Sequence, residues 1–397
     1  MTVYLDNAAT EPLRSQARDA WLEASASLGN PSSIHGPGRT ARRLLEDARE
    51  RLAGVLDCDP IEIVLTSGGT ESVNLALQGM LAAAGARGHG VVVPDGEHHA
   101  TVDTLAWLER AGRAEVRAVP LDGVGRMDLE AWTAALARPG VVAATLLAAN
   151  NEVGTVQPFA EAVAAAAEAG VPAHVDAVGA LGHLPLSFRT LRGAASGSAG
   201  LVALSVSSHK VGGPAGVGAL VVSRDAELQA VLHGGGQQRG LRSGTQDVAG
   251  AAAFAVAAEL AESERAAESV RVATLRDRLV AGVRAAVPDA ELLGDPADRL
   301  PGNAHLLFPG ARGETLLFLL DTAGIAVSTG SACQAGVAEP SHVVLAMGRS
   351  TREASQVLRI TLGRTSTTAD VDAAVAAIGP AVERARAASG RRPGARS

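Results

Sequence analysis

The sequence predicts an α/β protein with a large domain built on a mostly parallel sheet and a smaller α+β domain. Residues 40–222 alternate between helical stripes and short β-branched runs, which is typical of βα units around such a sheet. The short runs are almost continuously apolar, as expected for strands that are covered on both faces. After a glycine-rich stretch at residues 234–244, the pattern changes to long helices and isolated strands.

The elements of the large domain follow one another in this order. An apolar helical stripe runs through residues 44–56, and a short strand is expected at residues 61–65. Alanine-rich helices separate the further expected strands, which are residues 91–93, 141–147, 173–175, 201–206 and 217–222. The last two runs follow each other so closely in the sequence that an antiparallel excursion is expected there, meaning that one strand of the sheet runs opposite to its neighbours.

The C-terminal part predicts the smaller domain. Residues 249–287 are expected to be largely helical, and further strands are expected near residues 304–308, 325–328 and 357–361. We assign residues 13–255 to the large domain, residues 1–12 and 256–390 to the small domain, and residues 391–397 to a disordered tail. That tail is short, basic and contains proline.

Composition excludes several classes of protein. The 397-residue chain is 47% hydrophobic and 2% aromatic, and its net charge is −7, which argues against nucleic-acid binding. Two cysteines, Cys58 and Cys333, cannot form a disulfide framework, so a reducing compartment is expected. The N-terminus lacks the pattern of a signal peptide, and no run of ~20 apolar residues occurs. We therefore expect a soluble, cytoplasmic protein without a membrane partner.

The most informative residue is Lys210, which is the only lysine in the sequence. It stands between the apolar run at residues 201–206 and a Gly-Gly-Pro loop. A buried lysine of lowered pKa forms Schiff bases, and arginine cannot replace it in that role. An ordinary exposed lysine is the alternative, but a chain that otherwise uses arginine throughout argues against it. The sequence therefore predicts a Schiff-base lysine.

Two segments at expected strand ends suit a phosphorylated, aromatic cofactor. The segment TSGGTES (66–72) opens a helix, so its glycines and free N–H groups suit a phosphate. A plain turn with Thr66 or Ser67 as helix N-cap is the alternative. Asp176 follows an apolar strand and suits a protonated pyridine nitrogen, although a helix N-cap is about equally expected.

Two glycine-rich loops carry further chemistry. The segment 234–245 contains Arg239, Arg242 and Thr245, and it suits anion contacts better than a flexible linker. The segment 328–336 carries Cys333 among small residues. A free cysteine is usually buried and inert, but in such a loop a mobile nucleophile is expected, with the thiolate as its reactive form.

Together these strings resemble the cysteine desulfurases of the NifS/IscS type, which are pyridoxal-phosphate-dependent members of the class-V aminotransferase family. The resemblance runs from residue 4 to about residue 365 and includes the strings YLDNAAT, GNPSS, TSGGTES, EHH, NNEVG, HVDA, SSHK, GGGQQRGLRSGT and STGSAC, in that order. The string EPSH (339–342) is similar to the NifS/IscS branch. The resemblance implies PLP-dependent transferase fold type I, in which the large domain holds a mostly parallel seven-stranded sheet.

The resemblance also implies roles for individual residues. Lys210 would hold pyridoxal 5′-phosphate as a Schiff base, His98 would stack on its ring, and Cys333 would attack the substrate sulfur and keep it as a persulfide. The implied cofactor site consists of Gly69, Thr70, His98, Asn151, Asp176, Ser207, His209, Lys210 and, from the other subunit, Thr245. The implied substrate site consists of Asn30, Asn151 and Arg359. Of these, Arg359 would bind the carboxylate of the substrate. No metal site is implied beyond a transient iron–sulfur contact at Cys333.

Two positions depart from the family's pattern. Gly179 stands where a glutamine usually donates to the phenolic oxygen of the cofactor, and His183 stands where lysine is common. We expect the missing donor to change the rate of the reaction and not its type.

The implied reaction converts L-cysteine to L-alanine in a homodimer and passes sulfur to an acceptor such as an iron–sulfur scaffold protein. A selenocysteine lyase or an aminotransferase of the same fold is the alternative, but a transaminase needs no thiol. A scaffold without turnover is a further alternative, against which Lys210, Asp176 and Cys333 argue. Acceptors in tRNA thiolation or DNA phosphorothioation also stay open.

Overall fold

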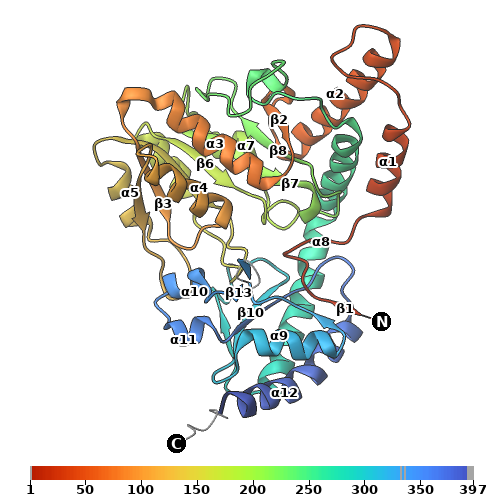
Figure 1. Ribbon diagram of the computed structural model, residues 1–397, viewed down its shortest axis with the longest axis vertical. Helices are drawn as coiled ribbons and strands as arrows, with labels where there is room; N and C mark the ends of the chain where they lie inside the picture. The colour runs from red at the N-terminus through yellow and green to blue at the C-terminus, as the bar shows by residue number, and fades with distance from the viewer. Residues whose placement is uncertain (1, 331–332, 335–336, 391–397) are drawn as a thin grey trace, which may run out of the picture.

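The computed structural model describes residues 2–330, 333–334 and 337–390 (Figure 1). Its main feature is a seven-stranded sheet of order β2-β8-β7-β6-β5-β3-β4. In chain order these strands are β2 (Ile63–Thr66), β3 (Gly90–Pro94), β4 (Glu115–Val119), β5 (Val141–Leu147), β6 (Pro172–Asp176), β7 (Gly200–Ser207) and β8 (Gly218–Val222). Strand β8 runs antiparallel to β2 and β7, and the other neighbours are parallel. The expected antiparallel excursion is confirmed.

Helices cover both faces of this sheet (Figure 1). The helices of this part are α1 (Ser15–Ser25), which packs on α8, α2 (Gly36–Leu56), α3 (Gly69–Ala84), α4 (His99–Arg110), α5 (Leu129–Leu136), α6 (Phe159–Glu168), α7 (Phe188–Arg192) and α8 (Val248–Ala286). One core packs α2, α5, α6, α7 and the first part of α8 against the sheet, and its largest side chains are Trp132, Phe188 and Phe254. A second core packs α3 and α4 on the other face. Burial on both faces explains the apolar strands.

The smaller part is built on the antiparallel sheet β14-β10-β9, with β9 (Glu291–Leu293), β10 (Asn303–Leu307) and β14 (Val357–Thr361). The rest of α8, α9 (Gly313–Thr322) and α12 (Thr368–Gly390) share its core. Strand β1 (Val3–Tyr4) pairs in parallel with β11 (Ile325–Ala326), so the N-terminus belongs to this part. Strands β12 (Cys333–Gln334) and β13 (Val337–Ala338) form a hairpin before α10 (His342–Ala346) and α11 (Thr351–Ala354).

Helix α8 joins the two parts. Its residues Ala251–Ala261 lie in the core of the large sheet, and Val272–Val283 lie in the core of the small one. The boundary that we place at residue 255 therefore falls inside one continuous helix of 39 residues. Across the described residues, no helix has both the length and the apolar character that crossing a membrane requires. The predicted tail at residues 391–397 lies outside the described residues.

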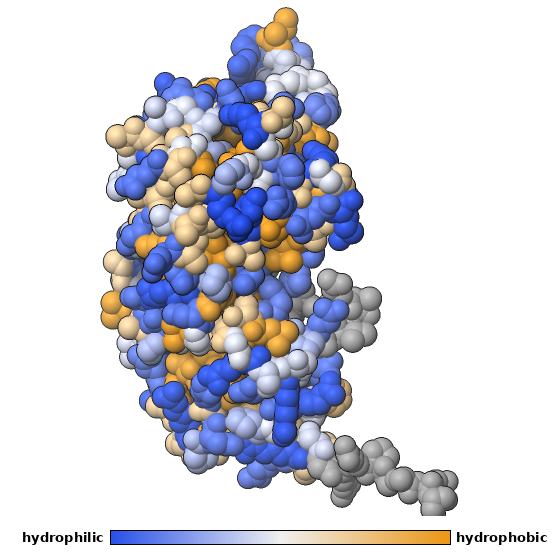
Figure 2. All heavy atoms as spheres, turned by 90° about the vertical axis from the view of Figure 1, so that its left-hand side faces the viewer, coloured by the Kyte–Doolittle hydropathy of each residue, from blue (hydrophilic) through white to orange (hydrophobic). Residues whose placement is uncertain are grey.

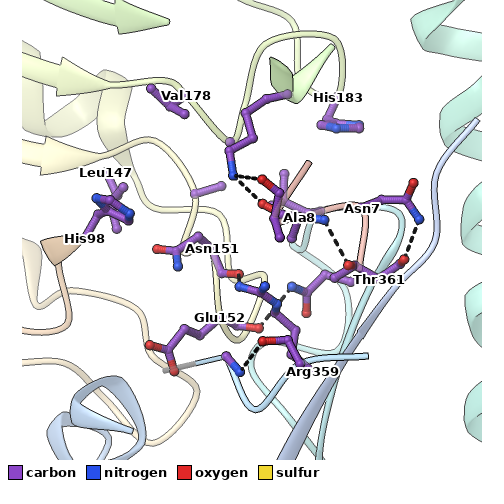
Figure 3. A pocket seen from close by; sticks show the side chains of 18 of the residues that line it. Asn7, Ala8, His98, Leu147, Asn151, Glu152, Val178, His183, Arg359 and Thr361 are labelled. Carbon is purple, nitrogen blue, oxygen red and sulfur yellow. Dashed lines mark hydrogen bonds between the residues drawn. The ribbon is translucent and has the colours of Figure 1, made fainter. Parts of the chain in front are cut away.

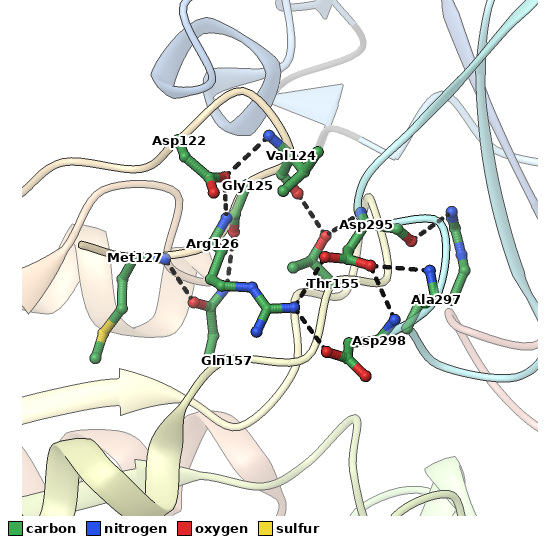
Figure 4. Close-up of polar contacts among 11 residues, drawn as sticks. Asp122, Val124, Gly125, Arg126, Met127, Thr155, Gln157, Asp295, Ala297 and Asp298 are labelled. Atoms are coloured by element: carbon green, nitrogen blue, oxygen red, sulfur yellow. Dashed lines mark hydrogen bonds and ion pairs between the residues drawn. The ribbon is translucent and has the colours of Figure 1, made fainter. Parts of the chain in front are cut away.

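Polar contacts close the junction between the two parts (Figure 4). The Arg126 guanidinium lies 2.9 Å from an Asp295 carboxylate oxygen and 3.0 Å from one of Asp298. The Thr155 hydroxyl donates to the Val124 carbonyl and accepts from the Asp295 N–H at 2.9 Å. The loops on both sides of this junction are thereby held in fixed positions.

Three local differences from the expected elements have physical causes. The strand expected at residue 61 begins at Ile63, because a 3₁₀ turn over Pro60–Glu62 is closed by a capping box from Asp59. The pattern does not predict strand β4, because this strand lies at the sheet edge and Glu115 and Arg117 interrupt its apolar residues. Helix α3 has Gly68 as its N-cap and not Thr66 or Ser67. The remaining 3₁₀ turns are Gly85–Arg87, Ser208–Lys210 and Gln238–Gly240.

Candidate active site

A cavity of about 440 Å³ lies between the large sheet and the small sheet, beyond the C-terminal ends of β5, β6 and β7 (Figure 3). Ligands of open α/β sheets bind outside this edge of the strands. The cavity is lined by eight of the predicted site residues, which are Gly69, Thr70, His98, Asn151, Asp176, His209, Lys210 and Arg359. The predicted cofactor and substrate groups therefore converge although up to 290 residues of sequence separate them.

Lys210 stands in the 3₁₀ turn that follows β7, with its amine directed at the N-terminal segment. The Nζ atom donates to the carbonyl of Ala9 at 3.0 Å and also to the carbonyl of Ala8. Burial, followed by the Arg359 cation, lowers the pKa of this amine to about 8, while Asp6 and Asp176 oppose the shift. A substantial neutral fraction near pH 8 is what nucleophilic attack on a carbonyl requires.

Asp176 ends β6 and is 3% exposed. Its Oδ1 atom accepts the Val178 N–H at 2.9 Å. Burial raises the pKa of this carboxyl to about 6, while the bond from Val178 and the Lys210 cation oppose the rise. A buried carboxyl of this kind is stabilised by a cationic N–H from a ligand.

His98 is the N-cap of α4 and faces the cavity (Figure 3). Its Nδ1 atom accepts the Ala100 N–H at 3.0 Å, which leaves Nε2 as the protonated nitrogen of the neutral ring. Burial, followed by the charge of Lys210, lowers the pKa of His98 to about 4. The ring is therefore neutral at physiological pH, as stacking on an electron-poor ring requires.

The backbone at the start of α3 leaves space for a ligand group to approach closely. Gly68 has a φ of 145°, and a Cβ atom on Gly69 would lie 2.7 Å from Val178. Beneath this turn the Ser207 hydroxyl is buried without a hydrogen-bond partner among the described residues. His209, next to Lys210, exchanges a hydrogen bond of 2.9 Å with the Thr10 hydroxyl. A phosphate at the helix start would give the orphaned Ser207 hydroxyl its partner.

Arg359 reaches the cavity from β14 in the small sheet. Its side chain is 6% exposed, donates to the Asn151 carbonyl at 3.0 Å, and pairs with Asp6. Its Nε atom is buried and has no partner among the described residues. A planar guanidinium held in this way can bind a substrate carboxylate.

Three predicted site residues, Ser207, Asn30 and Thr245, do not line the cavity, and a fourth, Cys333, lies in a segment whose side chains the structure does not describe. Asn30 and Thr245 are exposed and do not line it, and Asn30 Oδ1 accepts the Ser32 N–H at 2.9 Å. Cys333 lies in β12, but its side chain is outside what the structure describes. Cys58 is buried, and its burial, followed by Glu62, Asp59 and Asp57, raises the pKa of its thiol to about 12. Burial makes the largest contribution to this rise in pKa.

Several cavity residues were not assigned from the sequence, namely Asn7, Glu11, Glu152, His183, His342 and Thr361. Asn7 and Ala8 bond to Thr361 at 2.7 and 2.9 Å, so the N-terminal segment forms one wall. The strings YLDNAAT, NNEVG and EPSH contain three of these residues and could have indicated them. Gly179 also lines the cavity, and a Cβ atom there would meet only the Ala149 carbonyl, at 3.9 Å.

Comparison with known proteins defines the family. A family model described as Aminotransferase class-V matches residues 3–374. The IscS-like cysteine desulfurase of Mycobacterium tuberculosis is 47% identical over 391 residues, which are 97% of this chain and 98% of that protein. A cysteine desulfurase of Cereibacter sphaeroides is 41% identical, over 98% of this chain and 97% of its own length.

Solved structures agree with this result. A structure described as a NifS-like protein has a TM-score of 0.89 and 34% identity, and the match covers 97% of this chain and all of that one. The DndA protein of Streptomyces lividans has a TM-score of 0.74 and 33% identity, over 88% of this chain and 97% of its own. The chain belongs to the class-V aminotransferase family. Within this class it belongs to the cysteine desulfurases of the NifS/IscS type, and the predicted fold class is confirmed.

Proposed function

We propose that this protein binds pyridoxal 5′-phosphate on Lys210 and converts L-cysteine to L-alanine, with transfer of the sulfur to Cys333 as a persulfide. Membership of the cysteine desulfurases supports the reaction. The observation that carries the proposal is that the half-buried Lys210 and the buried Asp176 and Arg359 face one cavity, although the sequence separates Lys210 from Arg359 by 149 residues.

The cavity fits the cofactor. Lys210 offers an amine whose pKa burial has lowered to about 8. Asp176 offers a buried carboxylate to the pyridine nitrogen, and the Ser207 hydroxyl, which is buried without a partner, offers a donor to the phosphate. Gly69 has no room for a side chain beside Val178, so the backbone can approach the phosphate closely. When bound, pyridoxal phosphate withdraws electrons from the α-carbon of the amino acid.

Each residue of the site has a separate role in the proposed reaction. Arg359 binds the substrate carboxylate, Asn151 orients the substrate beside it, and Lys210 moves protons at the α-carbon. The neutral His98 ring covers one face of the cofactor. The C–S bond of L-cysteine breaks, an S–S bond forms at Cys333, and the former β-carbon takes a proton, so one thiol and L-cysteine give one persulfide and L-alanine without an external oxidant.

We also propose a homodimer that completes the site. The segment between α1 and α2 projects from the body and carries an apolar tip (Figures 1 and 2). Leu28 and Ile34 in this segment are 85% and 90% exposed, and Asn30 lies between them in the sequence. A second subunit would cover these side chains and bring Asn30 and Thr245 to a neighbouring cavity. The persulfide would then pass, in the cytoplasm, to an acceptor such as an iron–sulfur scaffold protein.

Reduction of the cofactor-loaded protein with borohydride tests the site. Peptide mapping should place the whole label on Lys210, and the wild type should release L-alanine and sulfide from L-cysteine in the presence of a thiol reductant. Lys210→Arg keeps the charge but cannot form the imine, so it should carry no label and release no alanine. A labelled peptide without Lys210, or transamination of L-cysteine with no sulfide, would overturn the proposal.

A further inference from the structure

Glu152 and His342 lie side by side in the cavity wall. Both residues line the cavity, and Figure 3 shows Glu152 near Asn151 and Arg359, across from Val178 and His183. Neither has a role in the cofactor or substrate binding that we propose. Glu152 is 2% exposed, so its carboxylate needs partners among the surrounding side chains.

Hydrogen bonds fix the position of Glu152. Its backbone N–H donates to Asn150 Oδ1 at 2.9 Å, and its carbonyl accepts from the side chain of Asn303 at 3.0 Å. The Ser341 hydroxyl donates to Oε2 at 2.5 Å. The other carboxylate oxygen, Oε1, lies 3.9 Å from His342 Nδ1. The carboxylate therefore presents one oxygen to the neighbouring imidazole.

The hydrogen bonds of His342 decide which of its nitrogens is basic. Its Nε2 atom lies 2.8 Å from the carbonyl oxygen of Glu97, which can only accept, so Nε2 carries the hydrogen. Nδ1 is then the nitrogen with a free lone pair, and it is the atom that faces Glu152. The side chain of His342 is 31% exposed and lines the cavity, so Nδ1 can exchange a proton with a group that enters there.

We infer that His342 and Glu152 form the proton-accepting pair for the thiol that attacks the substrate. His342 Nδ1 takes the proton of that thiol, and the Glu152 carboxylate stabilises the imidazolium that results. The thiolate then displaces the β-carbon from the substrate sulfur, the S–S bond forms, and the carbon receives a proton. When the site returns to its starting state, the proton held on His342 replaces the proton that the site gave to alanine. This inference rests on the proposed function.

Other titratable groups around the pair do not take this role. The His99 ring packs edge-on against His342, with 4.8 Å between the ring centroids, and its Nδ1 atom lies 3.6 Å from Asp103. His98 is held neutral by burial, and its Nδ1 atom is engaged by Ala100. Glu97 meets His342 through its main-chain carbonyl, and Glu339 stands at an exposed position three residues before His342.

Glutamine variants of the cofactor-loaded enzyme test the pair. In His342→Gln the side-chain amide can still donate to the Glu97 carbonyl but cannot take a proton. The rate of the first alanine release at pH 7 should fall roughly 10²-fold, with KM for L-cysteine changed less than twofold. Glu152→Gln should move the acidic limb of the pH–rate profile to lower pH, because a neutral amide no longer favours the imidazolium. His89→Gln, at an exposed position far from the cavity lining, should behave as wild type.

A titration of the wild type that needs no turnover completes the test. Nitrogen NMR of histidine-labelled enzyme, with the His342 signal assigned by its loss in His342→Gln, should show Nδ1 and not Nε2 gaining the proton. An unchanged rate and pH profile in folded His342→Gln, or protonation confined to Nε2, would overturn the inference. Failure of the wild type to release alanine would instead overturn the proposed function, while the NMR titration would still report on the pair.

Discussion

Arg359 and Asp6 are 353 residues apart in sequence and form an ion pair at the cavity, with 2.9 Å between Nη2 and Oδ1. The arginine that we assign to the substrate carboxylate is therefore already held by a carboxylate of the N-terminal segment. This pair fixes the plane of the guanidinium, and the Asn151 carbonyl holds it from a second direction. A substrate carboxylate meets an arginine that has lost most of its side-chain freedom before binding.

This arrangement predicts the effect of changing Arg359. In Arg359→Lys the bidentate contact is lost and the amine cannot serve Asp6, Asn151 and the substrate together. KM for L-cysteine should rise by roughly 10- to 100-fold, which corresponds to about 1.4–2.8 kcal/mol, with a smaller loss in kcat. Steady-state kinetics measure this split, and Arg352→Lys, at an exposed position on α11, is the matched control. Equal KM values in the wild type and Arg359→Lys would show that the carboxylate binds elsewhere.

Glu11 predicts a pH dependence of stability. Burial raises the pKa of its carboxyl from 4.5 to about 7, although Arg364 and Arg14 oppose the rise. The folded state therefore holds a proton that the unfolded state releases between these two values, so this contribution to stability is present below pH 4.5 and is lost as the pH rises through 7. The loss is at most about 3 kcal/mol.

Urea unfolding of Glu11→Gln at pH 5 and pH 8 checks this. The variant should gain free energy of unfolding relative to wild type at pH 8 and should gain little at pH 5. Glu168→Gln, at an exposed position on α6, is the control and should show no such difference. A constant difference between Glu11→Gln and wild type at both pH values would exclude a protonated Glu11.

The two cysteines should differ in their chemistry. Burial and the nearby carboxylates raise the pKa of the Cys58 thiol to about 12, so almost no thiolate forms at pH 8. Cys58→Ala should keep full turnover, whereas Cys333→Ser should still bind L-cysteine but release neither alanine nor persulfide. Alanine release and persulfide alkylation measure the two steps. Full activity of Cys333→Ser, or loss of turnover in folded Cys58→Ala, contradicts this assignment.

The proposed homodimer predicts complementation between an inactive chain and an impaired one. Lys210→Ala and Thr245→Ala should each be impaired alone, since one lacks the imine-forming amine and the other lacks a cofactor contact across the interface. After mixing and reassembly, one site of each hybrid contains Lys210 from one chain and Thr245 from the other. Activity should then exceed that of the Thr245→Ala homodimer. No gain in activity, or a cofactor-loaded monomer in sedimentation, would rule out shared sites.

The strands of the large sheet could be predicted because each is an apolar run between turns, as in β5 and β7, which is what burial on both faces demands. Strand β4 could not be predicted in this way, because a strand at the edge of a sheet needs little apolar surface. Lys210 stood out through its uniqueness, and Asp176 through its place after a strand. The pairs Arg359–Asp6 and Glu152–His342 depend on how distant segments pack, which no local pattern encodes.

The pairing of β1 with β11 has a practical consequence for producing the protein. Six residues after β1 begins, the backbone carbonyl of Ala9 already holds the Lys210 amine, and the intervening residues bond to Thr361. An affinity tag fused directly before β1 would therefore be attached only a few residues away from the proposed active site. We recommend a C-terminal tag, which attaches beyond α12 at the far end of the small part (Figure 1).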